Sequence, residues 1–571
     1  MSVSDRFRTR VQDKLHQLYG ERAPDVLHGI ARLLERYGRL RDSESKLWDE
    51  RSVVLITYGD QVRTGNGAAL EAQRRFLLDF KLDDVISDVH ILPFFPYSSD
   101  DGFSVIDYRR VDPAVGDWPD VDRLGESFGL MFDFVVNHCS QQNDWFRRYL
   151  NAESPYSGYF IDVEPATDIS AVTRPRSSPL LTPFPTVSGV KHVWTTFSAD
   201  QVDLNFADPA VLLEMLDVLL LYVRHGARVI RLDAIGFLWK EIGTTCMHLP
   251  QTHAVVKLMR DVVDEVAPGT VVLTETNVPH DENVSYFGEG DEAHAVYQFS
   301  LPPLLLDAFL TGNAGALNAW LHNLEYPSGA MTYFNFTASH DGIGVRPLEG
   351  LVPPERIVAL ADHVRQLGGR VSMRTAPDGS ESPYELNITY LSALGAPEGL
   401  PAELHARRFL SSQGVMLALR GMPGIYFHSL VGTENHTAGV EQTGQNRSIN
   451  RRKFESDELR RMVSGPSSLQ QKVFEGYRRM LAVRVSQPAF HPDAPQTIIT
   501  TEHPSVIAFE RQSLDREQTV VVLTNVSAQS VSLELGALTA HKLKRNLLDG
   551  APAESGTYEL APYAIAWLTT T

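Results

Sequence analysis

Cysteine is nearly absent from this chain. Cys139 and Cys246 are the only two among 571 residues, which is too few for a disulfide framework or a zinc site. The sequence therefore predicts neither a disulfide scaffold nor a metal centre. A chain without disulfides suits a reducing compartment, so we expect a cytoplasmic protein.

Long apolar runs and an excess of positive charge are missing as well. The most apolar stretch, residues 211–223, is interrupted by Glu214 and Asp217 and is shorter than a bilayer requires. The first residues, MSVSDRFRTRVQDKLHQ, have no apolar core, so we expect no secretory signal. Acidic residues outnumber basic ones by 71 to 52. This balance argues against nucleic acid or an anionic membrane as the main partner.

The chain does contain a regular alternation of short β-rich runs and helical stretches. The predicted strands lie at 53–58, 88–95, 130–136, 228–234, 270–276, 295–300, 331–337 and 422–427. Eight strands that alternate with helices are typical of a (β/α)₈ barrel. The predicted fold class is therefore α/β, with a TIM barrel as its centre.

Further segments surround this predicted barrel. They are an N-terminal helical arm (1–50), the catalytic barrel itself (51–138 and 202–489), an insert after the third strand (139–201), an insert after the seventh strand (343–400) and a small antiparallel C-terminal β-domain (490–571). The last segment is assigned to β-structure because its sequence contains β-rich runs and no helical stretches.

The strand at 228–234 has charged residues in an apolar run. Arg231 and Asp233 are two residues apart and share one face, whereas Ile230 and Leu232 face the other way. The charged pair is thus predicted to face the barrel interior near its carboxyl end, where barrel enzymes hold their active sites. Either the arginine keeps a nucleophilic carboxylate ionised, or the two residues form a structural buried ion pair.

Polar residues follow three other predicted strands at the same end of the barrel. They are Asp133, Asn137 and His138 at the third strand, Glu275 at the fifth, and His340 and Asp341 after the seventh. Each of these sites alone is compatible with a cap or a turn. Four together at one end of the barrel predict an active site.

Four motifs carry a resemblance to a known family. FDFVVNH, RVIRLDAIGF, TETN and ASHDG resemble the motif regions of the α-amylase family of glycoside hydrolases and transglycosidases. The resemblance implies that Asp233 is the nucleophile, Glu275 the general acid/base and Asp341 a carboxylate that stabilises the transition state. It also implies sugar-holding roles for Arg231, His138 and His340. A retaining enzyme needs Glu275 protonated, so its pKa is expected to lie above that of Asp233, which Arg231 would hold down.

Finer phrases resemble the sucrose phosphorylase subgroup of this family. They include SSDDGFSVIDY, TRPRSSPLLTPF, VWTTFSADQVDLNF, LWKEIGTTCMHLP and SINRRKF. By that resemblance Asp100 and Arg451 grip glucose hydroxyls, and Phe103 and Phe197 form an apolar platform. Arg176 would bind phosphate, although RPR could also be a solvated charge pair on a loop.

The loop after the seventh strand differs from that of sucrose phosphorylases. It reads HDGIGVRPLEGLVPPE, is shorter, and with the N-terminal arm looks closer to the glucosylglycerate phosphorylases. The implied reaction is reversible phosphorolysis of 2-O-α-D-glucosyl-D-glycerate to α-D-glucose 1-phosphate and D-glycerate through a covalent β-glucosyl-enzyme. The cationic candidates for the acceptor carboxylate are Arg174, Arg176, Lys240, Arg346 and Arg447. Arg346 could instead pair with Glu349.

Three alternatives stay open at this point. A sucrose or glucosylglycerol phosphorylase would use the same mechanism with a neutral acceptor. An α-glucosidase would pass the intermediate to water. A catalytically inactive carbohydrate-binding or transporter-associated relative should lack the three carboxylates. No cofactor is expected, the expected partners are small-molecule substrates, and the resemblance suggests a homodimer.

Overall fold

Eight parallel strands close into a barrel at the centre of the molecule. The computed structural model describes residues 4–41, 46–65, 67–176, 178–375, 381–553 and 556–571. The strands are β1 (Val54–Thr57), β3 (Asp88–Ile91), β4 (Gly129–Phe134), β9 (Ala227–Leu232), β10 (Val271–Thr274), β11 (Ala295–Tyr297), β12 (Thr332–Phe336) and β16 (Met422–Tyr426). Their order around the barrel is β1-β16-β12-β11-β10-β9-β4-β3. Each lies within its predicted range or within a residue of it, so the prediction of a (β/α)₈ barrel is confirmed.

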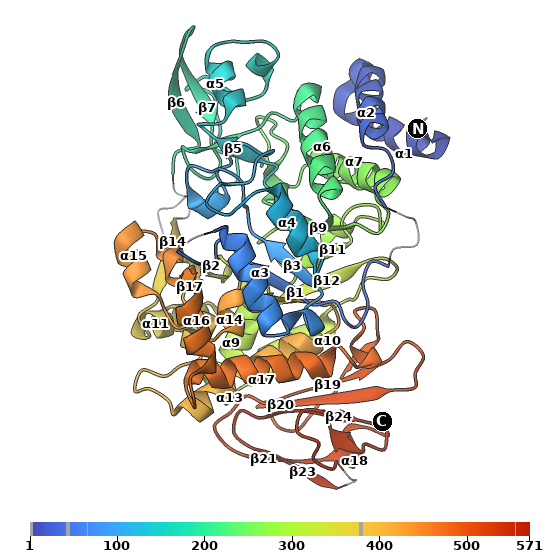
Figure 1. Cartoon of the computed structure of the whole chain (residues 1–571), viewed down its shortest axis with the longest axis vertical. Coiled ribbons are helices and arrows are strands. Elements are labelled where there is room, and N and C mark those ends of the chain that lie inside the picture. The colour runs from blue at the N-terminus through green and yellow to red at the C-terminus, as the bar shows by residue number, and fades with distance from the viewer. Residues whose placement is uncertain (1–3, 42–45, 66, 177, 376–380, 554–555) are drawn as a thin grey trace.

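Helices follow the barrel strands, as Figure 1 shows. They are α3 (Ala69–Asp79), α4 (Trp118–Gly125), α6 (Pro209–Arg224), α7 (Pro250–Val266), α8 (His280–Val284), α9 (Leu301–Thr311), α10 (Gly315–Asn323), α12 (Tyr390–Ala393), α13 (Ala402–Ala418), α14 (Phe427–Leu430), α15 (Thr437–Thr443), α16 (Ser456–Ser464) and α17 (Leu469–Arg484). The start of α6 shows how the sequence fixes a boundary. Asp208 accepts a hydrogen bond from the Ala210 N–H at 2.9 Å, and Pro209 occupies the first turn.

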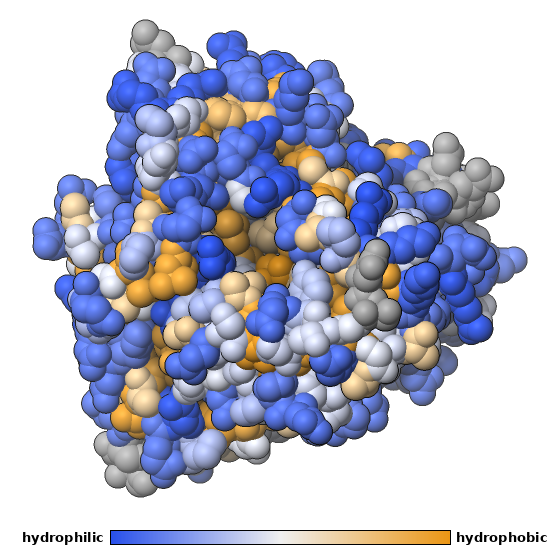
Figure 2. Space-filling view, turned by 90° about the horizontal axis from the view of Figure 1, so that it is seen from below, coloured by the Kyte–Doolittle hydropathy of each residue, from blue (hydrophilic) through white to orange (hydrophobic). Residues whose placement is uncertain are grey.

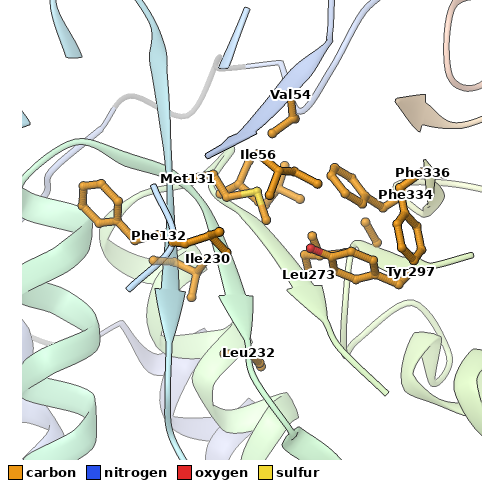
Figure 3. Close-up of a cluster of buried hydrophobic side chains, with 14 of the residues drawn as sticks. Val54, Ile56, Met131, Phe132, Ile230, Leu232, Leu273, Tyr297, Phe334 and Phe336 are labelled. Carbon is orange, nitrogen blue, oxygen red and sulfur yellow. The ribbon is translucent and has the colours of Figure 1, made fainter. Parts of the chain in front are cut away.

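The strand register decides which side chains face the barrel interior. Arg231 is level with Asp133 of β4 and with Leu273 of β10. Level residues on neighbouring strands point to the same side of a sheet. Figure 3 shows apolar side chains of several barrel strands gathered in one buried cluster, among them Ile56 and Met131. The polar residues of the same inward face lie nearer the carboxyl ends, as predicted.

The N-terminal arm packs on the outside of the barrel. Its helices α1 (Asp5–Tyr19) and α2 (Ala23–Tyr37) lie beside α6 and α7 (Figure 1). Lys14 on α1 contacts Asp261 on α7 at 2.8 Å. The hydroxyl of Tyr37 on α2 donates to the backbone carbonyl of Asp217 on α6 at 3.0 Å.

Two inserts rise from the carboxyl end of the barrel. After β4 the chain forms β5 (His138–Ser140), α5 (Asp144–Leu150), the hairpin β6 (Leu181–Thr186) and β7 (Gly189–Trp194), and β8 (Gln201–Asp203). After β12 it forms β13 (Ile343–Gly344), α11 (Pro354–Gln366), β14 (Arg370–Thr375) and β15 (Glu381–Asn387). The last three strands make a sheet in the order β13-β15-β14. Both inserts stand where a barrel enzyme binds its substrate.

The C-terminal segment is antiparallel β-structure. A five-stranded sheet runs in the order β18-β19-β20-β24-β22, and β21 pairs with β23. Their bounds, with the short helix α18, are β18 (Gln496–Ile498), β19 (Val506–Gln512), β20 (Thr519–Asn525), β21 (Val531–Glu534), α18 (Leu535–Leu538), β22 (Arg545–Asn546), β23 (Thr557–Leu560) and β24 (Ile565–Thr569). One further short pair joins β2 (Val62–Arg63) to β17 (Phe454–Glu455).

The surface of the molecule is mainly polar. On the face shown in Figure 2, hydrophobic residues appear in separate patches among hydrophilic ones. Within the described ranges, no helix has the length and apolar character needed to cross a membrane.

Candidate active site

One cavity at the carboxyl end of the barrel collects the predicted catalytic residues. Asp233 follows β9, Glu275 follows β10 and Asp341 lies after β12, and all three line this cavity. Most of the other predicted site residues line it as well: Asp100, Phe103, His138, Arg174, Arg176, Phe197, His340 and Arg346. Residues far apart in sequence, such as Asp100 and Asp341, therefore meet because the strands of a parallel barrel all end on the same side.

Arg231 lies beneath the cavity and contacts three carboxyl groups. Its Nη1 donates to Asp233 Oδ1 at 2.7 Å and also to Asp133. Its Nη2 is 3.9 Å from Glu275 Oε2. Asp133 is held from the other side by His90, whose Nε2 is 2.6 Å from Asp133 Oδ2. Arg231 therefore binds Asp233, as predicted, but the same guanidinium also binds Asp133.

The residue after the nucleophile candidate has an unusual backbone conformation. Ala234 has a φ of 49°, which is in the left-handed region that non-glycine residues seldom adopt. In this conformation its N–H donates to Glu275 Oε2 at 3.0 Å. The strained residue thus fixes Glu275 beside Asp233, which is the arrangement that a pair of catalytic carboxyl groups needs.

The pKa values of the two carboxyl groups are both shifted upward. Burial raises the pKa of Asp233 well above its ordinary value, although Arg231 opposes that shift. Burial also raises the pKa of Glu275, again against Arg231. Arg231 lowers the pKa of Asp233, as predicted, but burial outweighs an arginine shared among three carboxyl groups and the net shift is upward.

Distances still favour the proton on one of the two groups. The guanidinium is 2.7 Å from Asp233 but 3.9 Å from Glu275. Coulombic attraction is stronger at the shorter distance, and only Asp233 receives a hydrogen bond from the arginine. When the two carboxyl groups hold one proton between them, Asp233 is the ionised partner and Glu275 the protonated one.

Asp341 has its own arginine. Arg447 Nη1 lies 2.6 Å from Asp341 Oδ1, and the same guanidinium donates to Glu385 at 2.6 and 3.1 Å. Burial alone would raise the pKa of Asp341, but Arg447 and Arg451 outweigh it and the pKa falls below its ordinary value. Asp341 is therefore ionised at neutral pH.

The predicted sugar platform forms one wall of the cavity. Phe103 stacks on the His340 ring, with ring centroids 4.7 Å apart and planes 5° from parallel. Phe197 packs edge-on against Phe237 and lies 5.2 Å from the His138 ring. Burial lowers the pKa of both histidines, His340 well below its ordinary value. Both rings are neutral at pH 7 and can accept or donate a hydrogen bond without adding charge.

Asp100 and Arg451, predicted to grip glucose hydroxyls, lie together. Arg451 Nη1 is 3.4 Å from Asp100 Oδ1 and 2.7 Å from Asp101 Oδ2, and its Nε donates to the His340 carbonyl at 2.9 Å. Arg451 lines an adjoining groove rather than the main cavity. Both aspartates have positive φ, 52° and 48°, so this turn is strained as well.

The cationic candidates for an acceptor divide into two groups. Lys240 is buried, with its Nζ 2.7 Å from both Asp203 and Asn137, and its side chain does not line the cavity. The prediction of Lys240 as an acceptor ligand is therefore wrong, because its charge is already matched by a buried carboxylate. Arg447 is likewise taken up by Asp341 and Glu385.

Arg174, Arg176 and Arg346 line the cavity without a carboxylate partner in the part of the chain that the structure describes. Arg174 donates to the Ser178 carbonyl. Arg176 lies 6.0 Å from the centre of the Tyr384 ring. The alternative that Arg346 pairs with Glu349 is wrong, since Glu349 binds Arg374 at 2.6 Å.

Sequence reasoning missed several residues of this site. His90 and Asn277 lie at or after barrel strands, whereas Tyr384, Glu385 and Arg374 come from the second insert. The segment YELN carried no signal, because a lone glutamate in an irregular region is usually solvated. Among the described residues, no group of three or more histidine, cysteine, aspartate or glutamate side chains is arranged to hold a metal ion.

Comparisons with known proteins agree with this geometry. The family model of the α-amylase catalytic domain matches residues 82–334. The chain is 50% identical over 526 residues to the glucosylglycerate phosphorylase of Spirochaeta thermophila, covering 91% of this chain and 89% of that protein. The glucosylglycerate phosphorylase of Escherichia coli is 44% identical, with 98% and 100% covered. The chain belongs to the α-amylase family.

More distant members of the α-amylase family share the same architecture. The sucrose phosphorylase of Streptococcus mutans is 27% identical over 477 residues, covering 81% of this chain and 93% of that protein. The crystal structure of the sucrose 6F-phosphate phosphorylase from Thermoanaerobacter thermosaccharolyticum superposes with a TM-score of 0.72 at 25% identity, over 84% of this chain and 94% of that one. Within the family, this chain therefore groups with the glucosylglycerate phosphorylases.

Proposed function

We propose that this protein is a retaining glycoside phosphorylase that interconverts 2-O-α-D-glucosyl-D-glycerate plus phosphate and α-D-glucose 1-phosphate plus D-glycerate. One observation carries the proposal. The cavity combines three carboxyl groups, Asp233, Glu275 and Asp341, with arginines that have no carboxylate partner among the described residues. Unmatched cations on the wall of a cavity favour anionic ligands. Phosphate and D-glycerate are both anions, whereas water and fructose are neutral.

The first half of the reaction places the glucosyl unit on the enzyme. Asp233 attacks the anomeric carbon while Glu275 gives its proton to the leaving glycosidic oxygen. D-Glycerate leaves with that proton on its hydroxyl. The product is a β-glucosyl ester of Asp233. Arg231 orients the attacking carboxylate through the hydrogen bond at 2.7 Å.

The second half reverses these roles. Glu275, now ionised, accepts the proton of an incoming phosphate hydroxyl, whose oxygen attacks the anomeric carbon. The ester bond to Asp233 breaks, and α-glucose 1-phosphate forms with net retention. Two inversions at one carbon give this outcome. Asp341, held ionised by Arg447, stabilises the positive charge that develops on the sugar ring.

The remaining residues bind the glucosyl unit and phosphate. Asp100 and Arg451 bind sugar hydroxyls, while Phe103 and Phe197 supply the apolar wall. Arg176 binds phosphate. Its support is its place on the cavity wall, without an ion pair among the described residues, and the match of a guanidinium to phosphate oxygens.

The deciding experiment measures phosphate release from α-glucose 1-phosphate with one acceptor at a time. D-Glycerate, glycerol, fructose and fructose 6-phosphate are offered at equal concentration, and a reaction without acceptor reports hydrolysis. We expect fast release with D-glycerate. Preference for glycerol or fructose would replace the proposed acceptor, and equal release without acceptor would indicate a glucosidase.

Two further properties belong to the same proposal. The low cysteine content favours a cytoplasmic location, and the family resemblance favours a homodimer. Light scattering coupled to size-exclusion chromatography tests the second, with about twice the 63.6 kDa chain mass as the expected result.

A further inference from the structure

Arg346 lines the cavity with a guanidinium that has no partner among the described residues. It makes no ion pair and no side-chain hydrogen bond with any residue in the described ranges, and its buried Nε has no hydrogen-bond partner. A buried donor without a partner costs about 1–3 kcal/mol, more when it is charged. A side chain kept in that state is explained when a ligand completes its hydrogen bonds.

Two other arginines that line the cavity are bound to carboxylates. Arg447 binds Asp341 and Glu385 at 2.6 Å each. Arg374 binds Glu349 and also Ser382. Of the remaining arginines on the wall, Arg174 is exposed and donates to a carbonyl. Arg176 lies 6.0 Å from the centre of the Tyr384 ring and has no carboxylate partner among the described residues.

The loop of Arg346 is fixed on both sides. Gly344 is level with Glu385 in the pairing of β13 with β15, and the Val345 N–H donates to the Tyr384 carbonyl at 3.1 Å. On the other side the backbone approaches Asn277 closely. A Cβ atom on Gly344 would lie 2.6 Å from Asn277 Nδ2, so this position accepts only glycine without a shift. Arg346 is therefore placed by its backbone.

Asn277 links this loop to the acid/base residue. It follows Glu275 by two positions, lines the cavity, and has a buried Oδ1 without a hydrogen-bond partner. The acceptor oxygen must lie next to Glu275, because Glu275 takes its proton. An amide that offers both donor and acceptor groups and an unpaired guanidinium thus stand on the Glu275 side of the cavity.

D-Glycerate fits this pair of groups. It carries a carboxylate on the carbon next to the hydroxyl that attacks the anomeric carbon. A guanidinium fork binds a carboxylate with two hydrogen bonds, and an amide binds a hydroxyl. The charge of Arg176 acts on a different group, since it lowers the pKa of Asp341 after Arg447 and Arg451.

We propose that Arg346 binds the carboxylate of the acceptor and that Asn277 binds a neighbouring acceptor hydroxyl. The two anions of the reaction are then recognised by different arginines, D-glycerate by Arg346 and phosphate by Arg176. This inference rests on the proposed function, which names D-glycerate as the acceptor.

The test replaces Arg346 and measures the two half-reactions separately. Arg346→Gln should raise the KM for D-glycerate about ten- to a hundredfold, the loss expected for a hydrogen bond to a charged group. Turnover with glycerol, which lacks the carboxylate, should stay within about twofold of the wild type. Exchange of labelled phosphate into α-glucose 1-phosphate needs no D-glycerate, so it should also stay within about twofold. Arg346→Lys keeps the charge without the fork and should fall between Arg346→Gln and the wild type.

Arg365→Gln is the matched control. Arg365 lies on α11 of the same insert, is exposed, and pairs with Asp362 at 2.7 Å. The substitution removes the same charge outside the cavity, so the KM for D-glycerate should not change. A rise equal to that of Arg346→Gln would mean that only the overall charge matters.

Three outcomes would overturn the inference. An unchanged KM for D-glycerate in Arg346→Gln would remove Arg346 from the acceptor site. An equal loss of phosphate exchange and glycerate use would make Arg346 a phosphate ligand or a structural residue. A wild-type enzyme that rejects D-glycerate would contradict the proposed function itself, and that result is read before any variant is made.

Discussion

The floor and the rim of the cavity differ in how their arginines are paired. On the floor, Arg231 and Arg447 each contact two or more carboxyl groups. On the rim, Arg176 and Arg346 contact none among the described residues. Paired arginines orient catalytic carboxyl groups and share their charge with them. Unpaired ones leave a positive charge for the ligand, so the same residue type performs chemistry in one region and recognition in the other.

Replacing the proposed nucleophile on the cavity floor should have the largest effect on activity. Asp233→Asn should lower glucosyl transfer by at least about 10⁴-fold, because the amide cannot form the covalent ester. The isosteric side chain still accepts a hydrogen bond from Arg231, so the fold should persist. Steady-state turnover with D-glycerate and circular dichroism measure the two effects. Full turnover in this variant would remove Asp233 from the role of nucleophile.

Replacing Arg176, the second arginine of the cavity rim, tests whether the rim recognises phosphate. Arg176→Ala should lower kcat/KM for phosphate about a hundredfold, because a charge-assisted bidentate contact is lost. Slow hydrolysis of α-glucose 1-phosphate should fall far less. Initial rates of both reactions on one protein preparation give the comparison. Equal losses would contradict the assignment of Arg176 to phosphate.

Removing one carboxylate partner of Arg447 tests whether its ion pairs support catalysis and stability. Glu385→Gln removes one of the two carboxylates that contact Arg447. Arg447 should then bind Asp341 more strongly, and kcat should fall about tenfold. The free energy of unfolding should fall by about 3 kcal/mol, the usual cost of breaking a buried ion pair. Glu349→Gln, which unpairs the half-exposed Arg374, serves as control. Unchanged kcat in Glu385→Gln would show that the carboxylate has no part in setting Asp341.

The buried carboxyl group of Asp233 on the cavity floor should lower the stability of the fold at neutral pH. Because burial raises the folded-state pKa of Asp233 above its unfolded value, its contribution to stability is present at low pH and is lost as pH rises through that folded value. Asp233→Asn does not titrate. Its melting temperature should therefore exceed that of the wild type at pH 7 by a few degrees, and the difference should shrink as the pH falls below the folded-state pKa of Asp233. Thermal unfolding across this range checks the sign.

An exposed arginine far from the cavity gives the smallest effect. Arg36 on α2 pairs with Asp217 at 2.9 Å, and 64% of its side chain is exposed. Such pairs contribute about 0–1 kcal/mol. Arg36→Gln should therefore change the free energy of unfolding by less than about 1 kcal/mol and leave turnover unaffected. A larger loss would mean that the N-terminal arm depends on this contact.

The barrel and the catalytic floor could be predicted from sequence because they follow short-range rules. The two-residue repeat in 228–234 placed Arg231 and Asp233 on the inward face, and the strand register confirmed that placement. Parallel strands end on one side, so Glu275 and Asp341 could be brought to the same place without knowing any distance. Local pattern and barrel geometry were sufficient here.

Which cations of the cavity rim are unpaired could not be predicted in the same way. Lys240 and Arg346 are both single cations in irregular segments, and their sequence surroundings do not distinguish them. The difference lies in a partner distant along the chain, Asp203 for Lys240, and none among the described residues for Arg346. The upward shift of the pKa of Asp233 was missed for a related reason, because burial and charge sharing depend on the assembled site.

The pairing of β13 with β15 also limits how acceptor preference can change. Gly344 and Glu385 are level in that pairing, so the segment that carries Arg346 and the carboxylate that holds Arg447 are parts of one hairpin-like unit. A short loop graft from a relative with another acceptor would replace Arg346 and at the same time alter the support of Asp341. Exchange of the whole segment 343–387 would move both together. We therefore expect acceptor choice and catalytic power to change together when this segment is altered.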